Sequence, residues 1–168
     1  MHEALTYIYN DGGRAEAGRK GVVGDCVTRA IAIATGLPYE KVYQSIMRRS
    51  RKERSKDPSC PRSSARHGIY TNRAWFKRYM KELGFTWTRL PCGAKLDLQN
   101  LPHGRLVVSI RKHYTAVVDG CLHDIYDCSK QSVHGSTAYG YWCKESHEAQ
   151  KLPSHGEHRD REHGHDMG

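Results

Sequence analysis

Several patterns that define broad classes of protein are missing from this sequence. It contains no stretch of about 18 consecutive apolar residues, the minimum for a membrane-spanning helix. The opening MHEALTYIYNDGG has neither the basic nor the apolar region of a secretory signal. The six cysteines form no CxxC and no tight pairing pattern, which argues against a zinc ribbon or a disulfide framework. We therefore expect a cytoplasmic protein with reduced thiols and with no metal, no cofactor and no membrane partner.

Acidic residues are fewer than basic ones. The chain has 27 Lys and Arg against 18 Asp and Glu, a net charge of +9. Such an excess favours anionic partners, and nucleic acid is the obvious candidate. Much of the excess falls between Arg48 and Lys56, however, and a solvated helix end or loop explains a local run equally well. Nucleic acid is therefore a secondary candidate partner.

The length of 168 residues suits one ordinary domain. We expect that domain to span residues 1–144, with a basic, proline-broken surface loop at about 50–66. Residues 145–168 are polar and rich in histidine, with too little apolar surface to pack, and are predicted to be a disordered tail. Nothing in the sequence specifies an oligomeric state.

The hydrophobic period changes along the chain from that of helices to that of strands. GDCVTRAIAIATGLP predicts a buried helix, PYEKVYQSIMRRS a second and NRAWFKRYMKELGF a third, ended by Gly36, the basic run and Gly84 respectively. Beyond them, GRLVVSI, HYTAVV, CLHDIYD and TAYGYW have the pattern of antiparallel strands joined by tight turns such as Asp119-Gly120. The order predicts an α+β protein with N-terminal helices packed on a small antiparallel sheet.

Cys26 is predicted to lie in the first turn of the first helix. A thiol becomes an effective nucleophile as a thiolate, and the positive end of a helix dipole stabilises that charge. The amides of the same turn, including that of Cys26 itself, can donate to an oxyanion. Most cysteines at such positions are simply packed apolar residues, so Cys26 gains functional meaning only with a partner.

His113 is the predicted partner. It stands between a short turn at Arg111-Lys112 and the strand YTAVV, and the following strand carries aspartates that could orient its ring. If Asp119-Gly120 is a plain two-residue turn, Tyr126 faces His113 and Asp124 shares its side of the sheet. A one-residue bulge would instead bring Asp127 opposite His113. The pattern leaves both aspartates open.

These segments, in this order, resemble uncharacterised phage and prophage proteins that are similar to papain-like cysteine peptidases. The resemblance spans Asn10 to Cys143 and rests on GDCVTRAIAIATG, the W..YM.ELGF helix, LPHGRLVVSIRKHYTAVVDGCLHDIYDCS and YGYW. It implies a papain-like fold and a catalytic triad of Cys26, His113 and Asp127, with Asp124 as a supporting residue. A protein or peptide-like substrate is implied with it, and a phage-encoded chain would act in the host cytoplasm.

The sequence departs from the papain-like pattern just before Cys26. Papain-like enzymes usually carry a glutamine there that donates to the oxyanion, whereas AGRKGVVGDC contains none. The backbone amide of Cys26, Asn10 or Lys20 are the candidates to replace it; otherwise the activity is altered.

Two functions of different kinds follow from these observations. The first is a thiol hydrolase, a peptidase, amidase or isopeptidase, that works through an acyl-enzyme. The alternative is a non-enzymatic module that binds nucleic acid or protein through its basic segment and its Trp75-Tyr79 helix, on an inactive papain-like scaffold. A structural zinc protein is a third hypothesis, but the cysteines and histidines do not have the spacing of zinc ligands.

Overall fold

The structure, a computed structural model, describes residues 3–21, 23–60 and 62–144. The tail at 145–168, expected to be disordered, lies outside the described residues. The helices are α1 (Cys26–Thr35), α2 (Tyr39–Lys56), α3 (Ala74–Glu82) and the short 3-10 helix η1 (Cys128–Lys130). The strands are β1 (Thr6–Tyr9), β2 (Phe85–Arg89), β3 (Arg105–Ile110), β4 (His113–Val118), β5 (Cys121–Asp124) and β6 (Ala138–Lys144).

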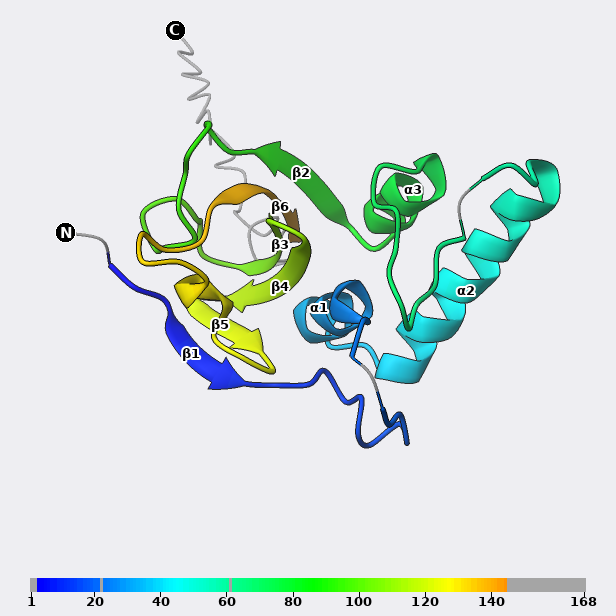
Figure 1. Cartoon of the computed structure of the whole chain (residues 1–168), viewed down its shortest axis with the longest axis horizontal. Helices are drawn as coiled ribbons and strands as arrows, with labels where there is room; N and C mark the ends of the chain where they lie inside the picture. The colour runs from blue at the N-terminus through cyan, green and yellow to red at the C-terminus, as the bar shows by residue number, and fades with distance from the viewer. Residues whose placement is uncertain (1–2, 22, 61, 145–168) are drawn as a thin grey trace, which may run out of the picture.

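The strands form one six-stranded sheet in the order β1-β5-β4-β3-β6-β2. Helices on one face of this sheet give an α+β fold, as predicted (Figure 1). The prediction of an antiparallel sheet is wrong at one edge, because β1 pairs with β5 in parallel. A strand that precedes all three helices is not tied to its neighbour by a tight turn, so the connection does not dictate its direction.

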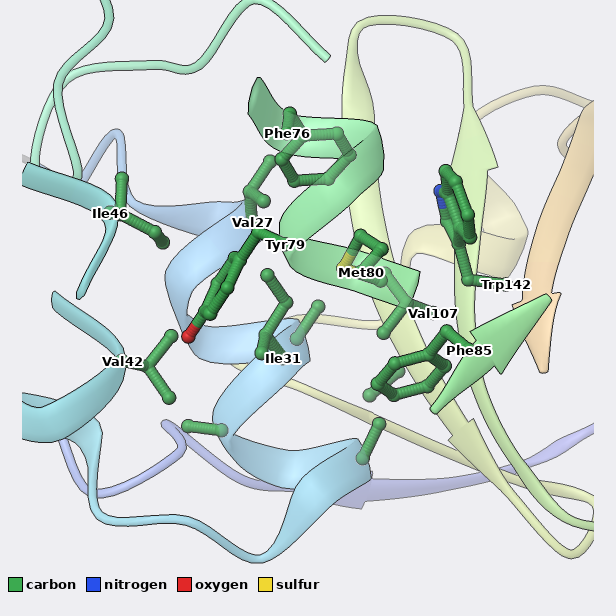
Figure 2. Packing of buried hydrophobic residues seen from close by; sticks show 14 of the residues in the cluster. Val27, Ile31, Val42, Ile46, Phe76, Tyr79, Met80, Phe85, Val107 and Trp142 are labelled. Atoms are coloured by element: carbon green, nitrogen blue, oxygen red, sulfur yellow. The ribbon is translucent and has the colours of Figure 1, made fainter. Parts of the chain in front are cut away.

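Helix α1 lies between the sheet and α2 and is the centre of the larger core (Figure 1). Seven of its ten residues are buried, because the sheet covers one side and α2 and α3 the others. Figure 2 shows Val27 and Ile31 of α1 among Val42, Phe76 and Met80 from the other helices. Gly36 closes α1 in the left-handed conformation at φ 72°, and α2 begins directly after Pro38, both as predicted.

Helix α2 is longer than predicted. It continues through the basic run to Lys56, so the first part of the expected surface loop at 50–66 is helical. Arginine, lysine and glutamate all favour helix, and the Ser50 hydroxyl donates to the Ser63 carbonyl at 3.0 Å. Ser63 and Ala65 are themselves buried. The prediction of a surface loop is therefore wrong for residues 50–56, which are helical, whereas residues 57–59 are non-helical and exposed as predicted.

The opposite face of the sheet has a second, smaller core. It contains Leu106, Val108, Val117 and Leu122 from the strands and Leu96 from the chain before β3.

The sequence patterns missed β2, which pairs with β6 at the edge of the sheet. In the part of the chain that the structure describes, no helix combines the length and the apolar composition needed to cross a bilayer.

Candidate active site

Cys26 is the first residue of α1, as the sequence predicted. The side chain is partly buried, and it packs against the larger core. Gly24, two residues earlier, lets the chain pass close to residues 66 and 67. A Cβ at position 24 would lie 3.0 Å from the Arg66 carbonyl oxygen and 3.2 Å from the His67 Cα. The helix start is thereby held in place, with its positive end at the sulfur.

His113 is the first residue of β4 and follows a two-residue turn. Ile110 and His113 are directly paired across the β3–β4 hairpin, with Arg111 and Lys112 between them. Lys112, the second residue of this turn, has a positive φ of 54°. The imidazole is 9% exposed and its ring centroid lies 5.2 Å from that of Tyr126. A short turn and a stacked ring therefore fix its position.

Asp124, the last residue of β5, holds His113. The distance between His113 Nε2 and Asp124 Oδ2 is 2.7 Å. This contact follows from the register of the β4–β5 hairpin, in which Val118 pairs with Cys121 and Ala116 with His123. No bulge intervenes between these pairs, so the plain-turn alternative, with Asp124 on the same side as His113, is the one that occurs.

Asp127 does not lie against His113, which corrects the triad that the resemblance implied. Its carboxylate instead caps η1, accepting from the Ser129 amide at 3.2 Å and the Ser129 hydroxyl at 2.6 Å. It also pairs with Lys130 Nζ at 3.4 Å. The physical reason is the register: without the bulge, the chain has left the sheet and turned into η1 by residue 127.

The imidazole of His113 interacts with the Cys26 thiol as well as with Asp124. Nε2 is bonded to Asp124, so Nδ1 is the ring nitrogen that remains for the sulfur. Burial alone would raise the pKa of the Cys26 thiol, but hydrogen bonding to His113 and to the Tyr114 amide and the charge of Arg29 lower it below its ordinary value. The thiolate therefore forms more readily at Cys26 than at an ordinary cysteine.

The pKa of His113 moves in the opposite direction. Burial alone would lower it, but the bonds to Asp124, Cys128 and Cys26 raise the pKa well above its ordinary value. The pKa of Asp124 would be raised by burial and is instead lowered, chiefly by its bond to His113. Cys26, His113 and Asp124 thus form a row in which each pKa shift favours the charged form more than in the free side chain.

Arg29 ties this row to the helix that carries Cys26, and no sequence pattern pointed to it. It is 4% exposed, and its Nη1 donates to Asp124 Oδ1 at 2.9 Å. Its Nε donates to Asp25 Oδ1, also at 2.9 Å. Asp25 Oδ2 accepts in turn from the Tyr39 hydroxyl at 2.5 Å and pairs with Arg14 Nε at 3.2 Å. Asp25 is the residue before α1, and it makes no side-chain cap bond because Arg29, Tyr39 and Arg14 hold its carboxylate.

Cys128 adds a third possible ligand atom beside His113 and Asp124. One side-chain atom from each of the three lies within 4.8 Å of the others, a spacing that a metal ion could use. The fully buried Cys128 thiol donates to Asp124 Oδ2, with an Sγ–Oδ2 distance of 3.7 Å. The Arg29 guanidinium already pairs with the same carboxylate and would repel a cation, which argues against a metal ion at this position.

Cys26 and His113 open into one pocket of about 580 Å³. Neither Asn10 nor Lys20 lines it. The Asn10 side chain is engaged with His123 Nδ1 at 3.2 Å and with the Gly12 amide at 2.9 Å, and the Lys20 carbonyl accepts from Arg66. The backbone amide of Cys26 is thus the oxyanion candidate that stays with the pocket. His67 and Ser109, which no sequence pattern singled out, supply further polar groups to its lining.

Comparisons with protein-family models, with curated protein sequences and with solved structures gave no match. What the chain does must therefore be argued from the geometry of Cys26, His113 and Asp124 and the pocket around the first two.

Proposed function

We propose that this protein is a thiol hydrolase that cleaves an amide or isopeptide bond. The observation that carries the proposal is the 2.7 Å contact between His113 Nε2 and Asp124 Oδ2, on a histidine that also interacts with a thiol at a helix N-terminus. Nucleophile, base and orienting carboxylate are the three parts that nucleophilic acyl transfer needs. We extend the proposal to a papain-like fold and a phage or prophage origin, on the sequence resemblance alone.

The reaction would run in two halves. The Cys26 thiolate attacks the carbonyl carbon, and the negative charge that develops on the oxygen is stabilised by the first amides of α1. The C–N bond breaks as the His113 imidazolium gives its proton to the leaving amine, which leaves a thioester on Cys26. His113 then takes a proton from water and the resulting hydroxide attacks the thioester; the C–S bond breaks, the acid leaves, and the Cys26 thiolate and the His113 imidazolium are restored. Asp124 stabilises the imidazolium throughout.

Selective alkylation tests the nucleophile. Iodoacetamide at neutral pH should modify Cys26 much faster than the other five thiols, including the exposed Cys92, because Cys26 favours its thiolate form. Peptide mass spectrometry over time gives the rate at each cysteine. Equal labelling of Cys26 and Cys92 would contradict the proposal. His113→Gln is the matched variant, and it should slow alkylation at Cys26 while leaving Cys92 unchanged.

Acyl transfer tests the hydrolase itself. With p-nitrophenyl acetate, the protein should form a thioester on Cys26 that then disappears as water hydrolyses it. Cys26→Ala should abolish both steps, and Cys92→Ala, which removes an exposed thiol outside the pocket, should retain them. A stable acetyl adduct on Cys26 that never turns over would show a reactive thiol without hydrolase activity.

One observation favours the second function, nucleic-acid binding. A pocket of about 420 Å³ between α2 and α3 is lined by five basic side chains, and it shares no lining residue with the Cys26 pocket. These side chains are Arg48, Arg49, Lys52, Lys56 and Arg78. The two carboxylates in the lining, Glu53 and Glu82, are already paired with Arg73 and Arg49. The pocket therefore keeps an excess of positive charge.

Salt dependence separates this function from the first. Fluorescence anisotropy with a single-stranded DNA oligonucleotide should show affinity that falls steeply with salt and survives Cys26→Ala. The double variant Lys52→Glu/Arg78→Glu should remove that affinity, whereas Lys41→Glu, at the other end of α2, should reduce it little. Binding that is absent at low salt would eliminate the nucleic-acid function and leave the hydrolase untouched.

A further inference from the structure

A larger pocket, of about 860 Å³, adjoins the Cys26 pocket. The two share Ser109, Tyr114 and Tyr139 in their linings, so a ligand that reaches the sulfur can extend from one into the other. We call the larger pocket the aromatic groove and identify it by Lys77, Lys81, Trp87, Tyr139 and Trp142. The proposed reaction does not use it.

Three elements build the aromatic groove. Helix α3 contributes the two lysines, the edge strand β2 contributes Trp87, and β6 contributes Tyr139 and Trp142. Figure 1 shows α3 beside β2 at this end of the molecule. Trp87 and Trp142 are paired directly across the two strands, with ring centroids 5.3 Å apart.

Gly140 keeps the Trp87 ring in its place. A Cβ at position 140 would lie 2.4 Å from Trp87 Cζ2 and 2.6 Å from the Thr88 carbonyl oxygen, so the indole lies directly over the backbone of β6. Trp87 is nevertheless 39% exposed and Tyr139 49% exposed. The Trp87 ring is therefore held in a fixed position, and both Trp87 and Tyr139 present aromatic surface to solvent that can anchor a ligand.

The charge around these rings has one sign. Lys77 and Lys81 are one turn apart on α3, and both are exposed. Among the described residues, no aspartate or glutamate lines the aromatic groove or the Cys26 pocket. Lys112 adds a positive charge to the lining of the Cys26 pocket, where Arg29 and His113 are paired with the buried carboxylates of Asp25 and Asp124. A ligand that spans both pockets meets cations and aromatic faces without an opposing carboxylate.

We infer that the aromatic groove binds an acidic peptide segment of the substrate, with an aromatic or apolar side chain on Trp87 and Tyr139 and carboxylates at Lys77 and Lys81. The inference rests on the proposed function, because it places the bond to be cleaved at Cys26. A peptide suits the groove better than a nucleic acid, because the groove leads to a thiol, whose acyl chemistry acts on carbonyl carbon. Its two lysines are also few for tracking a phosphate backbone.

Alkylating peptides test this inference without a known substrate. The probes are N-iodoacetyl-Trp-Glu-Glu-amide and N-iodoacetyl-Trp-Lys-Lys-amide, with iodoacetamide as the probe that contacts only the sulfur. We expect the acidic peptide to alkylate Cys26 about tenfold faster than the basic one, as two partly exposed charge pairs permit. Lys77→Glu/Lys81→Glu should reduce or reverse that ratio while the iodoacetamide rate stays unchanged.

Two controls isolate the groove. Lys41→Glu/Arg51→Glu changes the net charge equally on exposed positions of α2 and should keep the tenfold preference. Trp87→Ala should slow both peptides several-fold relative to iodoacetamide, because it removes a contact that both peptides share. Equal rates for the two peptides on the unmodified protein, with Cys26 still selected by iodoacetamide, would overturn the groove inference and leave the hydrolase standing.

Failure of the hydrolase proposal would look different, because iodoacetamide would then not select Cys26. The groove is tested in that case by the change in tryptophan fluorescence on adding acetyl-Leu-Glu-Glu-amide, which contains no reactive group. Binding that is lost in Lys77→Glu/Lys81→Glu supports the acidic-peptide site. The absence of binding would overturn the acidic-peptide site. Displacement of the peptide by a single-stranded oligonucleotide whose binding needs the same two lysines would also overturn it, because the groove would then be a nucleic-acid site.

Discussion

The Asp124 carboxylate is shared between two cationic groups. Its Oδ2 faces His113 Nε2 at 2.7 Å, and its Oδ1 accepts from Arg29 Nη1 at 2.9 Å. The Ile125 amide also donates to Oδ1, at 2.8 Å. A carboxylate with this many donors is fixed in orientation and stays ionised, so it can hold the His113 ring in one tautomer and one position.

Two aspartates three residues apart allow a matched test of this role. Asp124→Asn removes the charge beside His113, so the pKa of His113 should fall and the Cys26 thiolate should lose its imidazolium. We predict that iodoacetamide alkylation of Cys26 near pH 6.5 slows by about tenfold or more. Asp127→Asn should change the rate by less than about twofold, because Asp127 caps η1. Equal effects from the two variants would contradict the assignment of Asp124.

Arg29 permits a test on stability rather than chemistry. Arg29→Met would leave Asp25 and Asp124 buried without their shared cation, which should lower the free energy of unfolding by about 3–5 kcal/mol. Arg19→Met is the control, because it also breaks an arginine–carboxylate pair, but one in which Glu40 is 44% exposed. Such a pair contributes at most about 1 kcal/mol. Urea denaturation measures both, and similar losses would show that the buried network does not stabilise the fold.

Secondary-structure elements bring these side chains together, and the start of α1 is the most constrained of them. Gly24 lies so close to the backbone of Arg66 and His67 that a methyl group there cannot be accommodated by a side-chain rotation. We predict that Gly24→Ala lowers the free energy of unfolding by about 1–3 kcal/mol and slows alkylation of Cys26, because the helix start must shift.

Gly18→Ala is the comparison for that variant. Its Cβ would meet nothing within 4 Å, although its φ of +75° also strains a side chain. This variant should therefore cost stability of about 1 kcal/mol without any change in the Cys26 rate. Thermal unfolding and peptide mass spectrometry provide the two readouts. A normal Cys26 rate in Gly24→Ala would mean that this contact does not position the nucleophile.

Local patterns predicted the elements whose ends carry strong signals. Gly36 and Pro38 separate α1 from α2, and the Asp119-Gly120 turn joins β4 to β5, all where the sequence indicated. The end of α2 was missed because the basic run was interpreted as a loop, although its residues favour helix. Strand β2 was missed because FTWTR is short and directly follows a helix.

Contacts between distant segments could not be read from such patterns. The choice between Asp124 and Asp127 depended on one residue of register, which the sequence left open. The parallel pairing of β1 with β5 joins segments far apart in the chain and has no local signal. The role of Arg29 could not be predicted for the same reason. An arginine on a helix is normally exposed, and only its contacts with Asp25 and Asp124 in the folded chain make its burial favourable.

Across the whole molecule, the ionised row couples the site to global stability. A group whose pKa is raised on folding, such as His113, stabilises the fold fully below its unfolded pKa of about 6.5 and loses that contribution as the pH rises. Cys26, whose pKa is lowered, does the reverse: its contribution is present above the unfolded thiol pKa of about 8.5 and is lost as the pH falls. At pH values between the folded and the unfolded pKa of Cys26, the two slopes oppose each other.

Cys26→Ala should uncover this compensation. Without the thiolate, His113 remains bonded to Asp124 and its raised pKa persists, so raising the pH from about 6.5 to 8.5 should lower the free energy of unfolding by up to about 1.4 kcal/mol per pH unit. The unmodified protein should show a smaller slope, because Cys26 contributes one of opposite sign. Every other titrating group is common to both proteins and cancels in the difference. Parallel pH profiles from urea denaturation would mean that Cys26 keeps its proton in the folded state, and the thiolate that the hydrolase requires would not be preformed.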